Sequence, residues 1–171
     1  GVLRFWFTMK LGIIGCGDIA KQKHMPALKK LKDKCIITAF CDIKIDRAKK
    51  AAKKFGKDSS NVYKDYKELL DNETIDVVHI LTPNASHSPI AVDAFKAGKH
   101  VMCEKPMAHN KKSADKMMKA WQKSDKKFTI GYQFRFREDV QKLKKACKNG
   151  KLGEIYFAKA HALRRRGVPS W

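Results

Sequence analysis

The stretch M-K-L-G-I-I-G-C-G-D-I-A, residues 9–20, decides the expected fold. Its apolar run, residues 11–14, is short enough for a buried strand, and Gly15 and Gly17 end that run. Asp18 then opens a segment whose apolar residues recur with helical spacing. Strand, glycine turn and helix in this order form the arrangement that holds the pyrophosphate of a dinucleotide.

Each small residue of the turn has a physical role in that arrangement. Gly15 permits the tight turn, and Gly17 lets the backbone approach the phosphates without a Cβ in the way. Ala20 is small enough for the helix to pack closely on the strand, while the helix start at Asp18 and Ile19 offers N–H groups to the anion. Glycines also mark ordinary turns, so an ordinary turn stays the alternative to G-x-G-x-x-A.

A carboxylate follows the next apolar run. Asp42 comes directly after Cys35–Cys41, 22 positions beyond Ala20, where a dinucleotide-binding unit places the acid that accepts hydrogen bonds from the adenosine ribose. An acid there repels a 2′-phosphate, so the sequence favours NAD over NADP. Lys44 and Arg47 follow closely and weaken that preference, which keeps NADP open. The alternative role for Asp42 is to cap the helix that follows.

The rest of the chain alternates strand and helix patterns. We expect further strands at residues 62–63, 75–81, 100–103 and 128–132, and helices at 19–31, 45–55, 65–70, 90–97, about 114–121 and about 140–147. The alternation predicts an α/β fold with a doubly wound parallel sheet, the Rossmann arrangement. After Gly150 the pattern changes, and residues 153–161 alternate like a strand of an exposed sheet.

These patterns predict a dinucleotide-binding domain at residues 9–133 and the incomplete start of a second domain at residues 134–171. Residues 1–8 are expected to be a leader or non-native residues, because they are too short for a signal peptide and lack a cleavage pattern.

The net charge of +21 invites a nucleic-acid interpretation. Of the 38 basic residues seven are arginines, so 31 are lysines, and these are spread over nearly every predicted helix. No nucleic-acid motif accompanies them. We therefore expect no specific nucleic-acid partner, only non-specific attraction to polyanions.

The cysteine pattern indicates the redox state of the cellular compartment. Five cysteines, an odd number without C-x-x-C spacing, predict neither a metal site nor disulfides and favour a reducing, cytoplasmic compartment. No apolar run approaches the length of a transmembrane span, so no membrane partner is expected.

Lys105 is the first candidate for chemistry. Ligands of doubly wound sheets bind outside the carboxyl ends of the strands, and Lys105 follows a predicted strand there, between Glu104 and Pro106. A lysine held in that position can donate hydrogen bonds to a substrate hydroxyl or carbonyl. The alternative is one more surface lysine among 31.

Five motifs together resemble one family. They are G-C-G-D-I-A at residues 15–20, Asp42, T-P-N-A-S-H at 82–87, E-K-P at 104–106 and Y-Q-F-R-F at 132–136. The chain from residue 9 to 171 is similar to the glucose–fructose oxidoreductase/inositol dehydrogenase/rhizopine catabolism (Gfo/Idh/MocA) family. The resemblance implies a Rossmann domain followed by an α/β domain with an open, mostly antiparallel sheet. It also implies NAD(P)-dependent hydride transfer to or from a sugar, inositol or related polyol, by a homo-oligomeric full-length parent.

The resemblance also implies roles for individual residues. The pyrophosphate would be held by Gly15, Gly17, Asp18, Ile19 and Ala20, and the adenosine ribose by Asp42 with Arg47 nearby. The nicotinamide side would be lined by Thr82, Pro83, Asn84, His87, Glu104, Lys105 and Gln133. Lys105, as the catalytic residue, would contact substrate together with Arg135 and Trp171. The alternative role for His87 is to cap a helix start.

One part of the family pattern is missing. The family's catalytic acid/base pair, an aspartate and a histidine on a helix of the second domain, would lie beyond Trp171. We therefore expect an N-terminal fragment that binds cofactor without turnover. Two alternatives of the same fold stay open: a non-catalytic, cofactor-sensing regulator and an NAD-dependent glycosidase.

Overall fold

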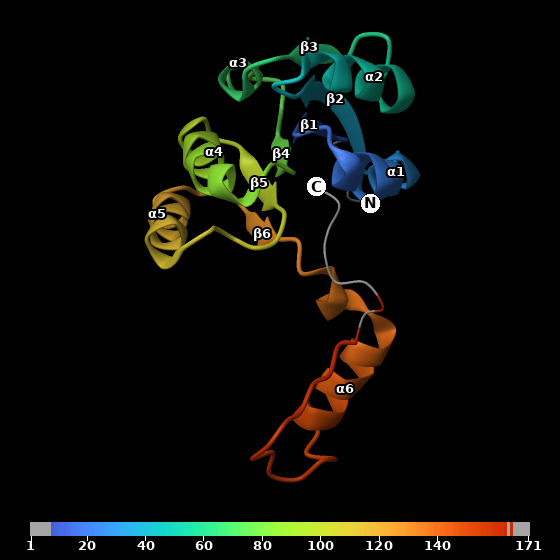
Figure 1. The fold of residues 1–171 in the computed structure, drawn as a ribbon, viewed down its shortest axis with the longest axis vertical. Coiled ribbons are helices and arrows are strands. Elements are labelled where there is room, and N and C mark those ends of the chain that lie inside the picture. The colour runs from blue at the N-terminus through green and yellow to red at the C-terminus, as the bar shows by residue number, and fades with distance from the viewer. Residues whose placement is uncertain (1–7, 164, 166–171) are drawn as a thin grey trace, which may run out of the picture. The chain divides into compact units, whose positions relative to one another are not determined.

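The computed structural model describes residues 8–163 and 165. The chain divides between Tyr132 and Gln133 into two compact units, and Figure 1 shows the elements of both. The first unit contains every strand of the described chain.

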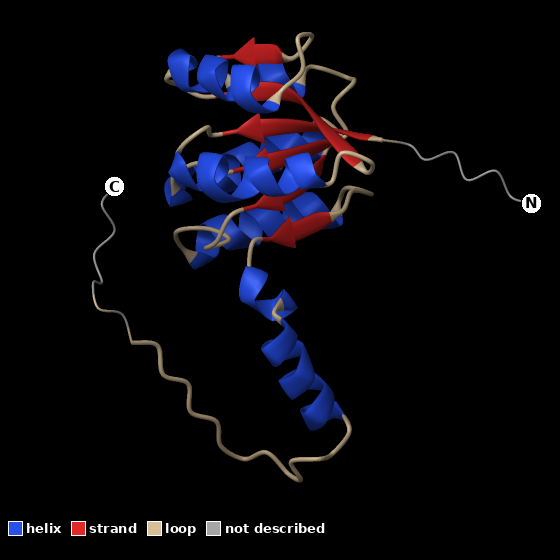
Figure 2. Ribbon diagram, turned by 90° about the vertical axis from the view of Figure 1, so that its right-hand side faces the viewer, coloured by secondary structure: helices blue, strands red, loops and turns tan. Residues whose placement is uncertain are grey.

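Strands and helices alternate along the first unit, and Figure 2 shows its helices packed beside the strands. Their bounds are β1 Met9–Ile14, η1 Ala20–His24, α1 Met25–Lys30, β2 Cys35–Cys41, α2 Ile45–Phe55, β3 Asn61–Tyr63, α3 Tyr66–Leu70, β4 Val77–Ile80, α4 Asn84–Lys96, β5 His100–Cys103, α5 Lys111–Gln122 and β6 Phe128–Ile130.

The six strands form one parallel sheet in the order β3-β2-β1-β4-β5-β6. Ile14 at the end of β1 lies opposite Cys41 of β2 and Ile80 of β4, so the carboxyl ends of these three strands meet at one edge. The strand order reverses between β1 and β4, and such a reversal is where doubly wound sheets bind ligands. The predicted parallel Rossmann sheet is confirmed.

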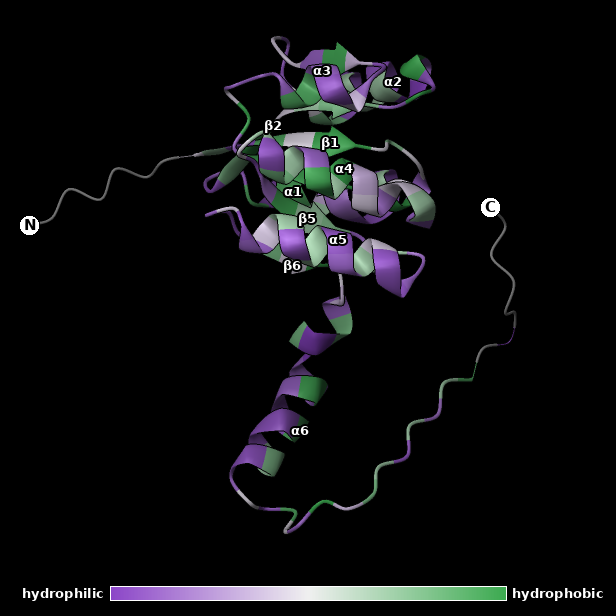
Figure 3. Cartoon of the chain, turned by 90° about the vertical axis from the view of Figure 1, so that its left-hand side faces the viewer, coloured by the Kyte–Doolittle hydropathy of each residue, from purple (hydrophilic) through white to green (hydrophobic). Residues whose placement is uncertain are grey.

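The sheet is buried on both faces, which explains why its strands are nearly continuous apolar runs. Ile13 packs in one cluster with Met25 of α1 and Ala48 of α2. The next residue, Ile14, points the opposite way into a second cluster with Phe95 of α4 and Met117 of α5. Figure 3 shows the result, with hydrophobic strands inside and hydrophilic residues on the outer helix surfaces.

The first helix differs from a regular α-helix. The predicted helix at 19–31 contains a π-helical segment, η1, in which Met25 N–H donates to the Ala20 carbonyl oxygen. Pro26 follows directly, in the first turn of α1. Because proline has no N–H and its ring crowds the preceding turn, the wider π turn lets the helix continue through it.

Some boundaries also differ from the predicted ones. α4 begins at Asn84 instead of residue 90, because its first turn is polar and gives no apolar periodicity, although His87 and Ser88 are buried there. The strands predicted at 75–81 and 128–132 are shorter, Val77–Ile80 and Phe128–Ile130. Asp65 caps α3 as predicted, accepting the Lys67 N–H.

The second unit contains the short 3-10 helix η2 (Gln133–Phe136) and α6 (Glu138–Lys148). The strand predicted at 153–161 is wrong for this structure, in which those residues form no strand. A strand needs a neighbour to receive its hydrogen bonds, and alternation of side chains alone does not supply one. Large apolar side chains are exposed here instead, including Tyr156 at 94% and Leu163 at 95%.

Candidate cofactor site

The glycine turn after β1 has the geometry that the sequence predicts. Gly15 has a φ of +94°, and a Cβ placed on it would lie 2.6 Å from the Leu81 carbonyl oxygen. Only glycine fits both the angle and the space. A Cβ on Gly17 would meet nothing within 4 Å, so this glycine faces open space just before the helix.

Asp42 joins the ends of β1 and β2. Its buried carboxylate accepts the Cys16 N–H at Oδ2 (2.9 Å) and the Lys44 N–H at Oδ1 (2.8 Å). Lys44, not Asp42, is the N-cap residue of α2, so the capping alternative is wrong. Each carboxylate oxygen accepts about two hydrogen bonds, which leaves acceptor positions for ribose hydroxyls.

Cys16, between the two glycines, is an inert thiol. Burial raises the pKa of its thiol to about 12, and the nearby Asp42 charge adds to this effect. A thiol with that pKa is protonated at neutral pH and is not a nucleophile.

His87 connects the loop after β4 to the loop after β5. It is fully buried, with Nδ1 2.8 Å from the Pro106 carbonyl oxygen and Nε2 2.8 Å from the Thr82 carbonyl oxygen. Each ring nitrogen thus lies at hydrogen-bond distance from a carbonyl oxygen of one of the two loops. This position suits a residue that holds the loop after β4 and the loop after β5 together.

The remaining residues of the T-P-N motif are more open. Pro83 is the N-cap residue of α4, and Pro83 and Asn84 are exposed. The Thr82 hydroxyl accepts from the Ser86 hydroxyl at 2.8 Å. These residues lie at the carboxyl end of β4, next to the glycine turn, since Leu81 N–H donates to the Ile14 carbonyl oxygen.

Glu104 and Lys105 follow β5 at the same edge of the sheet. Glu104 Oε2 accepts the Lys105 N–H at 3.0 Å, and the Lys105–Pro106 peptide bond is cis. The Lys105 side chain is exposed.

The sequence did not predict that His24 is a partner of Glu104 in the E-K-P motif. Nε2 of His24, the last residue of η1, lies 2.9 Å from Glu104 Oε1, and the ring of His79 from β4 packs edge-on against His24 at 5.9 Å. The available signal was weak, a histidine four residues after Ala20 in the helix that follows the glycine turn.

The other predicted site residues are exposed or lie outside the described residues. Arg47 is exposed on α2. Gln133 and Arg135 are exposed in η2 of the second unit, and Trp171 lies outside the described residues. Within residues 8–163 and 165, no group of three His, Cys, Asp or Glu side chains is placed to hold a metal ion.

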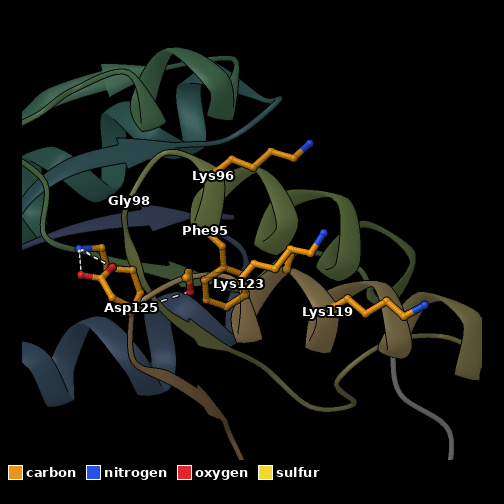
Figure 4. Close-up of a pocket in the computed structure, with 9 residues that line it drawn as sticks. Phe95, Lys96, Gly98, Lys119, Lys123 and Asp125 are labelled. Carbon is orange, nitrogen blue, oxygen red and sulfur yellow. Dashed lines mark hydrogen bonds and ion pairs between the residues drawn. The ribbon is translucent and has the colours of Figure 1, made fainter.

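An open depression of about 660 Å³ lies at the opposite edge of the sheet, where α4 and α5 end (Figure 4). Its rim carries Lys96, Lys119, Lys123 and Lys126 over the apolar surface of Phe95. Lysines near helix C-termini are stabilised by the helix dipole. Lys126, beyond the end of α5, instead pairs with Asp125 at 3.0 Å.

The residues of the carboxyl edge fit a dinucleotide. A Cβ on Gly17 would enter the space that a pyrophosphate needs, and the first turn of the following helix leaves N–H groups without intrahelical acceptors. Asp42 presents carboxylate oxygens at the end of β2, the place of the adenosine ribose.

Comparison with known proteins agrees with this geometry. Residues 9–132 match the model of the Gfo/Idh/MocA oxidoreductase family, which has an NAD-binding Rossmann fold. The chain belongs to this family. The Gfo/Idh/MocA match ends at the residue where the first compact unit ends.

Two relatives of this Gfo/Idh/MocA chain are dehydrogenases. D-glucoside 3-dehydrogenase of Escherichia coli is 36% identical over 163 residues, covering 95% of this chain and 46% of the relative. Myo-inositol 2-dehydrogenase of Thermotoga maritima is 35% identical over 156 residues, covering 91% and 44%. The chain thus spans about half the length of the curated relatives it matches.

Solved structures of the same fold contain nicotinamide cofactors. The WlbA dehydrogenase of Bordetella pertussis, in complex with NADH and UDP-GlcNAcA, has a TM-score of 0.80 at 27% identity and covers 88% of this chain and 45% of that one. The 3-ketoreductase KijD10 of Actinomadura kijaniata, in complex with NADP, has a TM-score of 0.76 at 26% identity, with 87% and 46% covered. Within the part of this chain that the structure describes, no helix is long and apolar enough to cross a membrane.

Proposed function

We propose that this chain is the cofactor-binding part of an NAD(P)-dependent dehydrogenase that oxidises a hydroxyl group of a sugar, inositol or related polyol. The observation that carries the proposal is the shared edge of the sheet. There the glycine turn after β1, the T-P-N loop after β4 and Lys105 after β5 end neighbouring strands. The named activities of the relatives support the substrate class.

The adenosine half of the cofactor would lie over β1 and β2. Gly17 and the helix start at Asp18 and Ile19 would receive the pyrophosphate, and Ala20, fully buried, keeps that helix close to the sheet. Asp42 would accept the ribose hydroxyls and favour NAD. The exposed Lys44 and Arg47 lie close enough in sequence to tolerate a 2′-phosphate.

The nicotinamide half would lie over β4 and β5. Thr82, Pro83 and Asn84 would line it, and Glu104 would accept from its ribose. His87 would act by fixing the two loops, because its ring nitrogens are occupied by the Thr82 and Pro106 carbonyl oxygens. Gln133, Arg135 and Trp171 stay proposed contacts of the nicotinamide and substrate.

When bound, the nicotinamide accepts a hydride from the substrate carbon, and the substrate hydroxyl must lose a proton at the same time. A proton acceptor has to lie within about 3 Å of that hydroxyl. Lys105 would donate a hydrogen bond to the substrate oxygen and orient it, but its side chain is solvated here. We therefore propose that a polypeptide of these 171 residues binds cofactor without turning substrate over.

One experiment tests both parts. The chain is titrated with NAD+ and NADP+ by calorimetry, and the same sample is incubated with NAD+ and a panel of polyols and sugars while reduced cofactor is followed by absorbance. We expect binding of cofactor and no reduction. Failure to bind either cofactor would contradict the binding proposal.

A matched pair of variants shows whether any turnover depends on Lys105. Lys105→Ala removes the proposed catalytic lysine, and Lys112→Ala removes an exposed lysine at the start of α5. Turnover abolished by Lys105→Ala and kept by Lys112→Ala would show that the 171 residues suffice for catalysis and would overturn the no-turnover proposal.

A further inference from the structure

We propose that His24 is a positioning residue for the nicotinamide half of the cofactor, because it holds Glu104 and, through Glu104, the backbone at Lys105. The inference rests on the proposed function and extends it to His24. This residue follows β1, whereas Glu104 follows β5, on the other side of the strand-order reversal between β1 and β4. Its basis is a chain of contacts that begins on the helix after β1 and ends at the loop after β5.

The first contact joins residues 80 positions apart. His24 Nε2 lies 2.9 Å from Glu104 Oε1, and each side chain is 13% exposed. A largely buried carboxylate is costly unless it is paired, so Glu104 depends on this donor. The second carboxylate oxygen accepts the Lys105 N–H at 3.0 Å. Both oxygens are therefore fixed, and the remaining lone pairs keep a defined direction for a ribose hydroxyl.

The surroundings leave the carboxylate little room to move. A Cβ on Gly131, after β6, would lie 3.0 Å from Glu104 Oε1, so a side chain there would require the carboxylate to shift by a few tenths of an ångström. His79 of β4, the strand between β1 and β5, packs against the His24 ring from within the sheet. Burial lowers the pKa of His79 to about 4, and the nearby His24 adds to this. The His79 ring is thus neutral at pH 7.

The helix itself is shaped to place His24. The π segment Ala20–His24 ends at this residue, and the extra residue in the turn changes the direction in which the side chains leave the helix. π segments inside helices occur frequently at functional sites. The same helix starts at the glycine turn, so one element contacts both the pyrophosphate position and Glu104.

The test compares two ligands that share the adenosine half. NAD+ carries the nicotinamide ribose, and ADP does not. Both are titrated calorimetrically into the full 171-residue chain and into His24→Ala, His24→Gln and Lys23→Ala. Glutamine keeps an N–H donor near the position of Nε2, and Lys23 is an exposed neighbour on the same helix that serves as the control.

We expect His24→Ala to lower NAD+ affinity about tenfold, the loss that follows when one charge-assisted hydrogen bond is removed, and to leave ADP affinity within about twofold. His24→Gln should restore most of the NAD+ affinity, and Lys23→Ala should change neither ligand. Should His24→Ala fail to fold, Glu104→Gln gives the same NAD+ and ADP comparison.

Three results would overturn the inference. Equal loss of NAD+ and ADP binding in His24→Ala would assign His24 a purely structural role. Unchanged NAD+ affinity would remove the role altogether. If the unsubstituted chain bound neither ligand, the proposed function would fail and the inference with it, a result distinguishable from the first two because it needs no variant.

Discussion

Asp42 has two tasks at the residue scale. It anchors the glycine turn through the Cys16 N–H, and in the proposed function it would also accept hydrogen bonds from the adenosine ribose. We expect Asp42→Ala to weaken NAD+ binding by about 1–3 kcal/mol, the range for a hydrogen bond to a charged group, and NADP+ binding by clearly less. Calorimetry with both cofactors measures the ratio of NAD+ affinity to NADP+ affinity. Loss of the turn anchor alone would weaken binding of both cofactors equally and leave this ratio unchanged.

Asp46→Ala, on the exposed surface of α2, is the matched control for Asp42→Ala. It should leave both affinities unchanged. Tighter binding of NADP+ than of NAD+ by the unsubstituted chain would show that Lys44 and Arg47 outweigh Asp42, contrary to the proposed preference.

His79 makes stability depend on pH. Its pKa in the folded chain, about 4, lies below the ordinary value of 6.5, because burial disfavours the charged ring and His24 adds to this. As the pH falls, the unfolded chain therefore binds the proton first. The contribution is complete above about pH 6.5 and is lost as the pH falls toward 4, on the order of 2 kcal/mol for this partly buried ring.

Urea denaturation at about pH 7 and about pH 5 measures this slope in the unsubstituted chain and in His79→Gln, which cannot titrate. We expect the unsubstituted chain to lose more stability between the two pH values than the variant does. Parallel pH profiles would exclude His79 as the source.

Residues that belong to a local motif could be predicted from sequence, and residues that meet across the sheet could not. Gly15 and Asp42 follow from spacing along one strand–turn–helix–strand unit. His24 and Glu104 are 80 positions apart, and they meet only because β1 and β5 flank β4 in the sheet. No periodicity or local motif records that contact.

At the scale of the element, the turn after β1 allows a paired test. Gly15→Ala places a Cβ 2.6 Å from the Leu81 carbonyl oxygen at a φ of +94°, so we expect a loss of at least about 2 kcal/mol in stability. Gly17→Ala meets no atom within 4 Å, so its stability should stay within about 0.5 kcal/mol. Urea denaturation measures both.

Cofactor affinity separates the two glycines further. Gly17→Ala should fold normally and bind NAD+ at least about tenfold more weakly, or about 1.4 kcal/mol, because the new methyl group enters the pyrophosphate position. Normal NAD+ affinity in Gly17→Ala would show that the dinucleotide does not approach this turn.

Element boundaries were predicted less well than element order, for physical reasons. The polar first turn of α4 gives no apolar stripe, and its buried His87 is held by carbonyl oxygens instead of apolar contacts. The π segment before Pro26 has no pattern of its own. Residues 153–161 alternate as a strand does, yet a strand forms only beside another strand.

At the scale of the whole molecule, the large positive charge follows from helix surfaces. Lysines occupy the last turn of α1, α2, α4, α5 and α6, where they complement the helix dipoles. The lysine-rimmed depression at the ends of α4 and α5 is a local instance of this distribution (Figure 4). These helix-terminal lysines account for part of the net charge of +21.

The first unit should also fold and bind ligand without the second unit. Both hydrophobic clusters, including the partly buried residues packed on them, lie between Ile13 and Ile130, so the first unit contains the complete core of the sheet. We expect a chain of residues 9–132 to unfold cooperatively at the same temperature as the full chain and to bind ADP equally well. It should also aggregate less, because it lacks exposed apolar side chains such as Tyr156 and Leu163.

Thermal unfolding followed by circular dichroism, ADP calorimetry and light scattering on both chains measure these three quantities. NAD+ titration of the same pair adds a test of Gln133, whose proposed contact with the nicotinamide is absent from the shorter chain. NAD+ affinity should then fall while ADP affinity stays constant. A shorter chain that unfolds without a cooperative transition would show that residues beyond Tyr132 complete the core, against the division of the structure into two units.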